Sequence, residues 1–101
     1  MTEEQVEIAI KAKGLTAPRI TPDNIDASIK YAEYFRVPNT TTTICALILS
    51  NNYVVVGHSA SVSIANFDEE IGKEVAYSNA REQIWALEGY RLKDKLYAEA
   101  N

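Results

Sequence analysis

Hydrophobic positions recur at helical spacing over the C-terminal third of the chain, and no proline interrupts them. This spacing predicts one long helix from about Asp68 to the late nineties. Asp68 or Asn66 suits the N-cap position, and the acidic residues of the first turn suit the positive end of the helix dipole. At 1.5 Å per residue the helix would be about 45 Å long, which is more than the rest of so short a chain covers easily.

Two shorter helical patterns precede the long helix. Thr2 is a favourable N-cap for the first of them, and Gly14 ends it. Thr21 followed by Pro22 is typical of a helix start, and the apolar spacing carries this second helix to about Phe35. We therefore expect two helices before the pattern changes.

Residues 41–58 alternate with the two-residue period of β-strands. We expect strands at 41–49 and 53–58, joined by a tight turn at Ser50-Asn51-Asn52, because asparagine tolerates the left-handed conformation that such turns need. Gly57 in the second strand indicates a bulge or a close backbone approach. Both faces of this hairpin are apolar, whereas a surface sheet normally has one polar face. One face can rest on the helices of the same chain, and a second copy of the chain would cover the other.

These patterns predict a single α+β domain over residues 1–101. The expected architecture is two N-terminal helices, a two-stranded antiparallel β-hairpin and a long C-terminal helix, completed by oligomerisation. The long helix supports the same assembly from independent residues, because apolar side chains occupy most of its circumference outside one charged arc.

Several residues of the C-terminal half and the second helix have two interpretations each. Asn79 and Gln83 lie in the apolar part of the long helix, where a buried amide is costly unless its hydrogen bonds are made. They either bond to a hairpin carbonyl or to each other across a symmetric interface, or Asn79 faces a ligand cleft. Arg81 and Arg36 are either solvated arginines beside aromatic side chains or phosphate ligands. Phe67 either packs on the first turn of the long helix or offers a stacking surface for adenine.

Composition and charge exclude several partners. The net charge of −4 disfavours a nucleic-acid polymer, whose binding proteins usually carry a basic stripe. Cys45 is the only cysteine, so the chain contains no disulfide framework and a reducing cytosol is the natural compartment. No apolar run approaches the ~20 residues that a membrane span needs. We therefore expect a cytoplasmic protein that binds neither a membrane nor a nucleic-acid polymer.

Residue types with catalytic potential are scarce in this chain. His58 is the only histidine, and no cysteine or histidine stands at metal-ligand spacing from it. The sequence has no glycine-rich phosphate loop and no Ser/His/Asp arrangement in a recognisable context. We therefore expect no catalytic residues, no metal site and no cofactor, and a protein that is not an enzyme.

Six short stretches are distinctive in combination. They are Phe35, Ile44-Cys45-Ala46-Leu47, Gly57 with Ser59-Ala60, Asn66-Phe67-Asp68 with Glu70-Ile71-Gly72, Asn79-Ala80, and Ile84-Trp85 with Leu87-Glu88-Gly89-Tyr90. This set resembles a family of small proteins encoded by tailed phages, which is related to the Thoeris anti-defence sponges. The resemblance implies a protein that binds the cyclic ADP-ribose signal of bacterial TIR-domain enzymes, or a cyclic oligonucleotide, and sequesters it without cleavage. It also implies dimers that assemble further, up to hexamers.

The resemblance implies a ligand held at a subunit interface, by aromatic stacking and by arginine–phosphate pairs. Phe67 would then stack on the adenine, and Asn79 would contact the ribose or the base. Arg81, Arg91 and Arg36 would bind the phosphates. The alternative is a phage protein that inhibits a host protein by direct binding through its acidic surface. A protein whose only role is self-assembly also fits the sequence.

Overall fold

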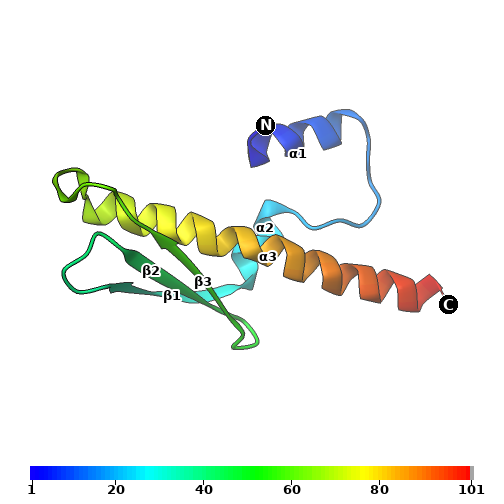
Figure 1. Cartoon of the computed structure of the whole chain (residues 1–101). Helices are drawn as coiled ribbons and strands as arrows, with labels where there is room; N and C mark the ends of the chain where they lie inside the picture. Colours follow the sequence, from blue (N-terminus) through cyan, green and yellow to red (C-terminus); the bar gives the residue numbers. More distant parts are fainter. Residues whose placement is uncertain (101) are drawn as a thin grey trace.

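In the computed structural model, which describes residues 1–100 of the chain, a three-stranded antiparallel sheet packs against one long helix (Figure 1). Two short helices precede the sheet, and α1 lies apart from it. The elements in chain order are α1 (Glu3–Ala12), α2 (Pro22–Ser28), β1 (Ile29–Arg36), β2 (Thr43–Leu49), β3 (Val54–Ser59), the 3-10 helix η1 (Ile64–Asn66) and α3 (Glu69–Ala100).

The main difference from the expected fold is the stretch that follows α2. We predicted a helix that runs to about Phe35, but α2 ends at Ser28 and residues Ile29–Arg36 form strand β1. This strand pairs with β2 along its length, so the predicted two-stranded hairpin is a three-stranded sheet with the order β1-β2-β3. Isoleucine and aromatic residues dominate β1, and they fit a pleated, half-buried surface better than a helix. Pairing with β2 therefore overrides an apolar spacing that also suits a helix.

The other expected elements are confirmed. Thr2 caps α1, and Gly14 follows that helix with a φ of 65°. Asn52 adopts a φ of 70° in the turn between β2 and β3. Asp68 caps the long helix, because its carboxylate accepts a hydrogen bond from the backbone N–H of Ile71 at 3.0 Å.

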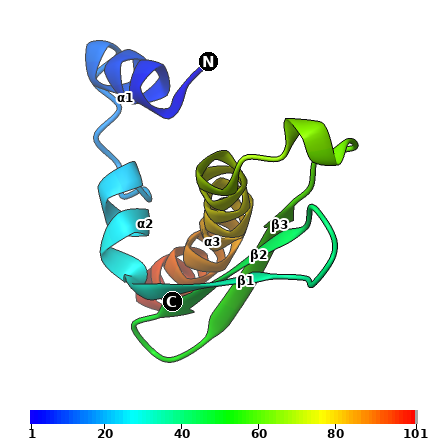
Figure 2. The ribbon, with the colours of Figure 1, turned by 90° about the vertical axis from the view of Figure 1, so that its left-hand side faces the viewer.

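The core lies between one face of the sheet and α3, which Figure 2 shows end-on above the strands. Small residues set the distance between these two layers. A Cβ at Gly57 would lie only 2.2 Å from the backbone nitrogen of Ala80 and 2.6 Å from the carbonyl oxygen of Ala76. The close backbone approach that we predicted from a glycine within a strand is therefore present. The buried apolar residues are Ile25, Cys45, Leu47, Leu49, Val55, Ala76, Ala80 and Ile84.

Two amides of α3 tie the helix to β3, the last strand of the sheet. The side-chain nitrogen of Gln83 donates to the carbonyl oxygen of Val56 at 2.5 Å, and that of Asn79 donates to His58 at 2.8 Å. These bonds confirm one of the alternatives drawn from the sequence, an amide bonded to a hairpin carbonyl. Val56 and His58 are alternate residues of β3, so their carbonyl groups lie on the same edge of this strand. The two amides therefore cover part of an edge that would otherwise be unpaired.

The opposite face of the sheet is uncovered by any described element of the chain. Phe35 is 57% exposed there, and Tyr31 and Val56 are each 50% exposed. Phe35 lies opposite Ile44 in the sheet register, and Tyr31 lies opposite Ile48, so these side chains form one apolar surface. We name this surface the outer sheet face. One hairpin face packs on the chain's own helix, as predicted, and the cover of the outer sheet face stays a prediction.

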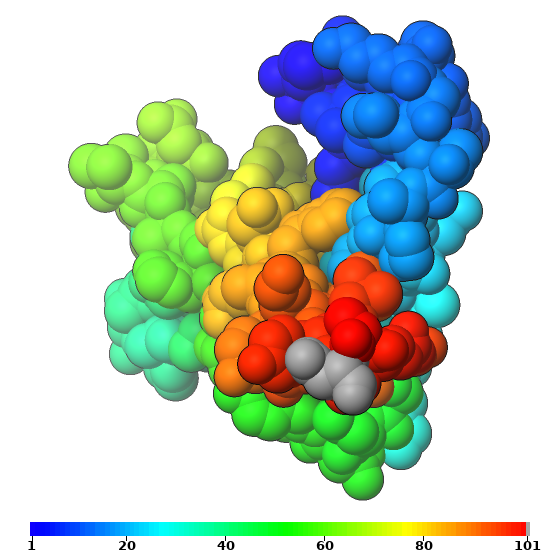
Figure 3. All heavy atoms as spheres, turned by 90° about the vertical axis from the view of Figure 1, so that its right-hand side faces the viewer, coloured from blue at the N-terminus to red at the C-terminus, as the bar shows by residue number. Residues whose placement is uncertain are grey.

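Two helical segments extend away from the sheet. The space-filling view shows the N-terminal segment (blue) as a separate lobe beside α3 (Figure 3). Within α1 no residue is buried, and Tyr90 in the C-terminal half of α3 is 71% exposed. None of the helices in residues 1–100 combines the length and the apolar content that a membrane crossing requires.

Replacing Gly57 by alanine should lower the free energy of unfolding by about 3 kcal/mol, because the added methyl group collides with the backbone of α3. Urea unfolding followed by circular dichroism measures the change. Gly89→Ala is the matched control: nothing lies within 4 Å of its Cβ position, so this helical substitution should instead stabilise the protein by about 0.5–1 kcal/mol. Equal stability of Gly57→Ala and the unmodified protein would contradict the close approach.

Candidate functional site

A cleft of about 430 Å³ opens where the chain passes from β3 through η1 into α3. We name it the connector cleft. Phe67 and Asn79, two of the residues that we predicted as ligand contacts, both line it. The full lining is Thr41, His58, Ser59, Ala60, Ser61, Asn66, Phe67, Asp68, Ile71, Gly72, Val75 and Asn79.

Arg36, a third predicted ligand residue, stacks on the Phe67 ring. The guanidinium carbon of Arg36 lies 4.0 Å from the ring centroid, within the range of a cation–π contact. A hydrogen bond from Arg36 Nε to the carbonyl oxygen of Thr40 at 3.1 Å holds the guanidinium in place. The structure therefore places Phe67 and Asn79 in the lining of the connector cleft, and it places Arg36, which does not line the cleft, against the Phe67 ring.

Asn79 keeps polar capacity that its structural bond does not use. One of its two N–H groups donates to His58, which leaves a second N–H and the carbonyl oxygen on an exposed side chain. Asn79 therefore serves both interpretations drawn from the sequence, as a tie to the hairpin and as a residue of a cleft.

The rest of the cleft lining contains both polar and apolar residues, and two short hydrogen bonds hold its polar part in place. Ser59 Oγ donates to the carbonyl oxygen of Gly72 at 2.6 Å, and Thr41 Oγ1 donates to that of Ser61 at 2.6 Å. Sequence analysis missed these residues and treated His58 as structural. A serine-rich connector after a strand was the available signal, and its contacts with Gly72 and Thr41 depend on the folded chain.

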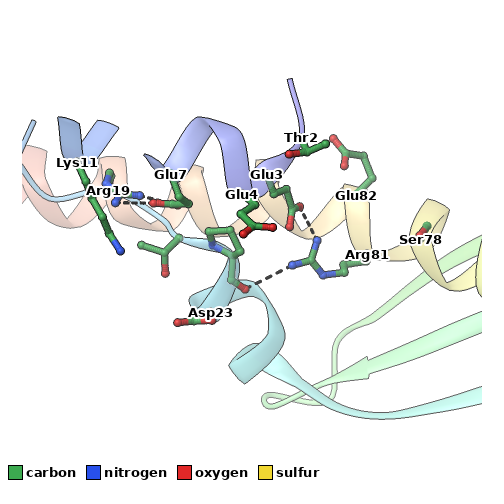
Figure 4. A pocket seen from close by; sticks show the side chains of 12 residues that line it. Thr2, Glu3, Glu4, Glu7, Lys11, Arg19, Asp23, Ser78, Arg81 and Glu82 are labelled. Carbon is green, nitrogen blue, oxygen red and sulfur yellow. Dashed lines mark hydrogen bonds and ion pairs between the residues drawn. The ribbon is translucent and has the colours of Figure 1, made fainter. Parts of the chain in front are cut away.

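Arg81 lies outside the connector cleft, in a hollow of about 770 Å³ between α1, α2 and α3 (Figure 4). We name it the N-terminal hollow. Arg81 pairs with Glu3 of α1 at 2.5 Å and with Asp26 of α2 at 2.8 Å. The hydrogen bond that Arg81 donates to the Glu3 carboxylate raises the pKa of Arg81 above its already high value, so this side chain is a permanent cation. Trp85 donates to the same Glu3 carboxylate at 3.2 Å. Arg81 therefore fastens two N-terminal helices to α3.

The N-terminal hollow is a poor site for an anion. Five carboxylate residues line it against three cationic ones, and its arginines are already paired. Arg19 pairs with Glu7 at 2.6 Å, and the hydrogen bond that Arg19 donates lowers the pKa of Glu7 below the ordinary value of a glutamate. Because the carboxyl pKa is lowered by folding, the pair stabilises the N-terminal segment when the pH is above the ordinary glutamate pKa, and this contribution is lost as the pH falls through the lowered value.

Arg91, the last predicted phosphate ligand, is also outside the connector cleft. It pairs with Glu88 at 3.1 Å and lines a separate groove of about 310 Å³ with Tyr53 and Tyr90. Within one chain, the structure thus places two of the five predicted ligand residues, Phe67 and Asn79, in the connector cleft. Arg36 contacts Phe67 from outside the cleft lining, and Arg81 and Arg91 lie elsewhere.

Cys45 lies in the core between β2 and α3. Burial raises the pKa of its thiol, which keeps the thiol protonated and unreactive. Among residues 1–100, no three His, Cys, Asp or Glu side chains gather as metal ligands would.

Replacing Glu3 by glutamine should loosen α1, because it removes the charge that Arg81 and Trp85 share. We expect hydrogen exchange of the α1 amides to rise about fivefold, which corresponds to about 1 kcal/mol for a partly exposed ion pair. Mass spectrometry of N-terminal peptides measures it, and Glu4→Gln in the same hollow is the control. The fastening role of Arg81 is contradicted if Glu3→Gln and Glu4→Gln exchange alike.

Residues 20–96 match the family described as "Phage protein (N4 Gp49/phage Sf6 gene 66)", and this stretch includes the whole sheet and the connector cleft but not α1. No curated protein and no solved structure was found to match the chain. The match agrees with the resemblance to small phage proteins that the sequence suggested. Because it covers more than half of the 101 residues, the chain belongs to the phage protein (N4 Gp49/phage Sf6 gene 66) family.

Proposed function

We propose that the protein is a phage anti-defence sponge, which binds a cyclic nucleotide immune signal and sequesters it without cleavage. A cyclic ADP-ribose isomer made by TIR-domain enzymes is the preferred ligand, and a cyclic oligonucleotide is the variant of the same chemistry. The observation that carries the proposal is that Phe67 and Asn79 line the connector cleft and that Arg36 stacks on the Phe67 ring. The resemblance to the Thoeris anti-defence sponges supports it.

The three side chains match the three parts of such a ligand. An adenine stacks on the Phe67 ring, where base–aromatic stacking is worth about 1–3 kcal/mol. The unused amide groups of Asn79 bond to ribose hydroxyls or a base edge. The Arg36 guanidinium, held beside the ring, pairs with a phosphate. The cleft volume of about 430 Å³ lies within the roughly 300–1,000 Å³ typical of small-molecule sites.

The proposal includes a homo-oligomer built from dimers. The outer sheet face supports it, because half-exposed aromatic and aliphatic side chains lie on both sides of β2, with Glu33 as the charged residue among them on β1. A ligand site at a subunit interface would also give the exposed Arg91 of a second copy a place beside the phosphates.

Binding of a cyclic ADP-ribose isomer, measured by calorimetry, should weaken about tenfold or more in Phe67→Ala, because the stacking surface is removed. Heat denaturation of the complex should release the ligand intact, as shown by chromatography. Asn79→Ala should weaken binding as well, with the oligomer preserved. Lys13→Gln, a charge change at the far end of α1, is the control.

Two results would count against the sponge. One is the absence of binding for every cyclic nucleotide tested, together with a stoichiometric host protein recovered from lysate, which would favour the inhibitor of a host protein. The other is a ligand returned in cleaved form.

Val56→Lys should convert the oligomer to monomers, because it places a charge on the outer sheet face where Val56 is half exposed. Sedimentation velocity measures the mass, and circular dichroism checks that the fold is kept. Asn51→Lys adds the same charge in the β2–β3 turn and should leave the oligomer unchanged. A monomeric unmodified protein at micromolar concentration would overturn the assembly.

A further inference from the structure

A second, smaller hollow lies next to the connector cleft, between the end of β1 and the first turns of α3. Its volume is about 120 Å³, and its lining is Tyr34, Phe35, Arg36, Thr43, Glu69 and Lys73. A water takes about 30 Å³ of liquid volume, so the hollow holds a group of roughly four water-sized atoms. We propose that this hollow binds a phosphate group, either free or carried by a nucleotide in the connector cleft.

An unpartnered buried hydroxyl is the first sign of a missing ligand. Thr43 is only 3% exposed, and its Oγ1 has no hydrogen-bond partner among the residues that the structure describes. A Cβ at Gly72 would lie 2.9 Å from this oxygen, so Thr43 sits directly under the first turns of α3. A buried hydroxyl without a partner is rare and unfavourable in folded proteins. A phosphate oxygen in the hollow would accept a hydrogen bond from the Thr43 hydroxyl.

Two cations flank the hollow from different elements. Arg36 comes from β1 and Lys73 from α3, and each is held beside an aromatic ring: Arg36 over Phe67, and Lys73 with its Nζ 5.6 Å from the Tyr34 centroid. Both side chains line the hollow that Thr43 also lines. Hydroxyl, guanidinium and ammonium donors in one small hollow are the groups that recognise a phosphate dianion.

Glu69 is the one carboxylate on the rim, and its charge opposes an anion. It pairs with Lys73 at 3.5 Å, a long distance for an ion pair, and its side chain is 69% exposed. An exposed pair of this kind contributes little, so a dianion can replace Glu69 as the partner of Lys73. The start of a 32-residue helix adds a further positive potential beside it.

The hollow and the connector cleft share one wall. Arg36 lines the hollow, Phe67 lines the cleft, and the two side chains are stacked on each other. A ligand that occupies both spaces would therefore carry its base and its phosphate on the two sides of this pair. This part of the inference rests on the proposed function, whereas binding of free phosphate does not.

Inorganic phosphate titrated into the full chain tests the inference, with calorimetry for affinity and thermal unfolding for stability, against sodium chloride of matched ionic strength. Phosphate should bind and raise the melting temperature. Thr43→Val keeps the side-chain shape and removes the hydroxyl. It should weaken phosphate binding at least tenfold while leaving the melting temperature of the ligand-free protein unchanged or higher. Lys73→Gln should weaken binding similarly, and Lys95→Gln near the other end of α3 should not.

Equal phosphate affinity in Thr43→Val and the unmodified protein would overturn the site, and so would a lower melting temperature of ligand-free Thr43→Val, which would show a hydroxyl already satisfied. The same variants titrated with a cyclic ADP-ribose isomer separate the two proposals. Phosphate binding that needs Thr43, without nucleotide binding, supports the phosphate site and refutes the sponge. Nucleotide binding that ignores Thr43, without phosphate binding, refutes the site and leaves the sponge.

Discussion

The close approach of α3 to the sheet at Gly57 is the constraint on which the rest of the structure depends. Only a residue without a Cβ leaves room there for the helix backbone at Ala76 and Ala80. The short distance lets Asn79 and Gln83 reach the carbonyls of β3, because side-chain amides span only a few ångströms. The same approach brings the start of α3 over the sheet, so the connector must fold back beside it and enclose the connector cleft.

Polar groups play a structural role on one side of the molecule, and the proposed ligand sites lie on the other. On the α1 and α2 side, Arg81 is paired with Glu3 and Asp26, and it holds to α3 both α2 and α1, a helix with no buried residue of its own. On the connector side, Arg36 stacks on Phe67 and pairs with no carboxylate among residues 1–100, and it lines the same hollow as the unpartnered hydroxyl of Thr43. An arginine whose hydrogen-bond donors are bound to carboxylates holds elements of the fold together. An arginine stacked on an aromatic ring can still pair with an anionic ligand.

Sequence reasoning succeeded where the rule was local. Thr2, Gly14, Asn52 and Asp68 each act through neighbours in the chain, and the apolar spacing of α3 needs no partner to be recognised. It failed over Ile29–Arg36, because an apolar spacing there suits helix and strand alike, and pairing with β2 decides between them. Phe67 and Asn79 could be chosen by residue type, but the partner of Arg81 lies 78 positions away and the hollow around Thr43 exists only once β1 is a strand.

The most direct measurement of the central claim is the amide chemical-shift map of isotopically labelled protein titrated with a cyclic ADP-ribose isomer. The connector cleft predicts the largest shifts at Phe67, Gly72 and Asn79, with saturation at one ligand per cleft. Small or no shifts are expected at Glu3 of α1 and at its hydrogen-bond partner Trp85 of α3, since the carboxylates of the N-terminal hollow repel an anion. Shifts centred on that region, or none in the connector cleft, would contradict the account.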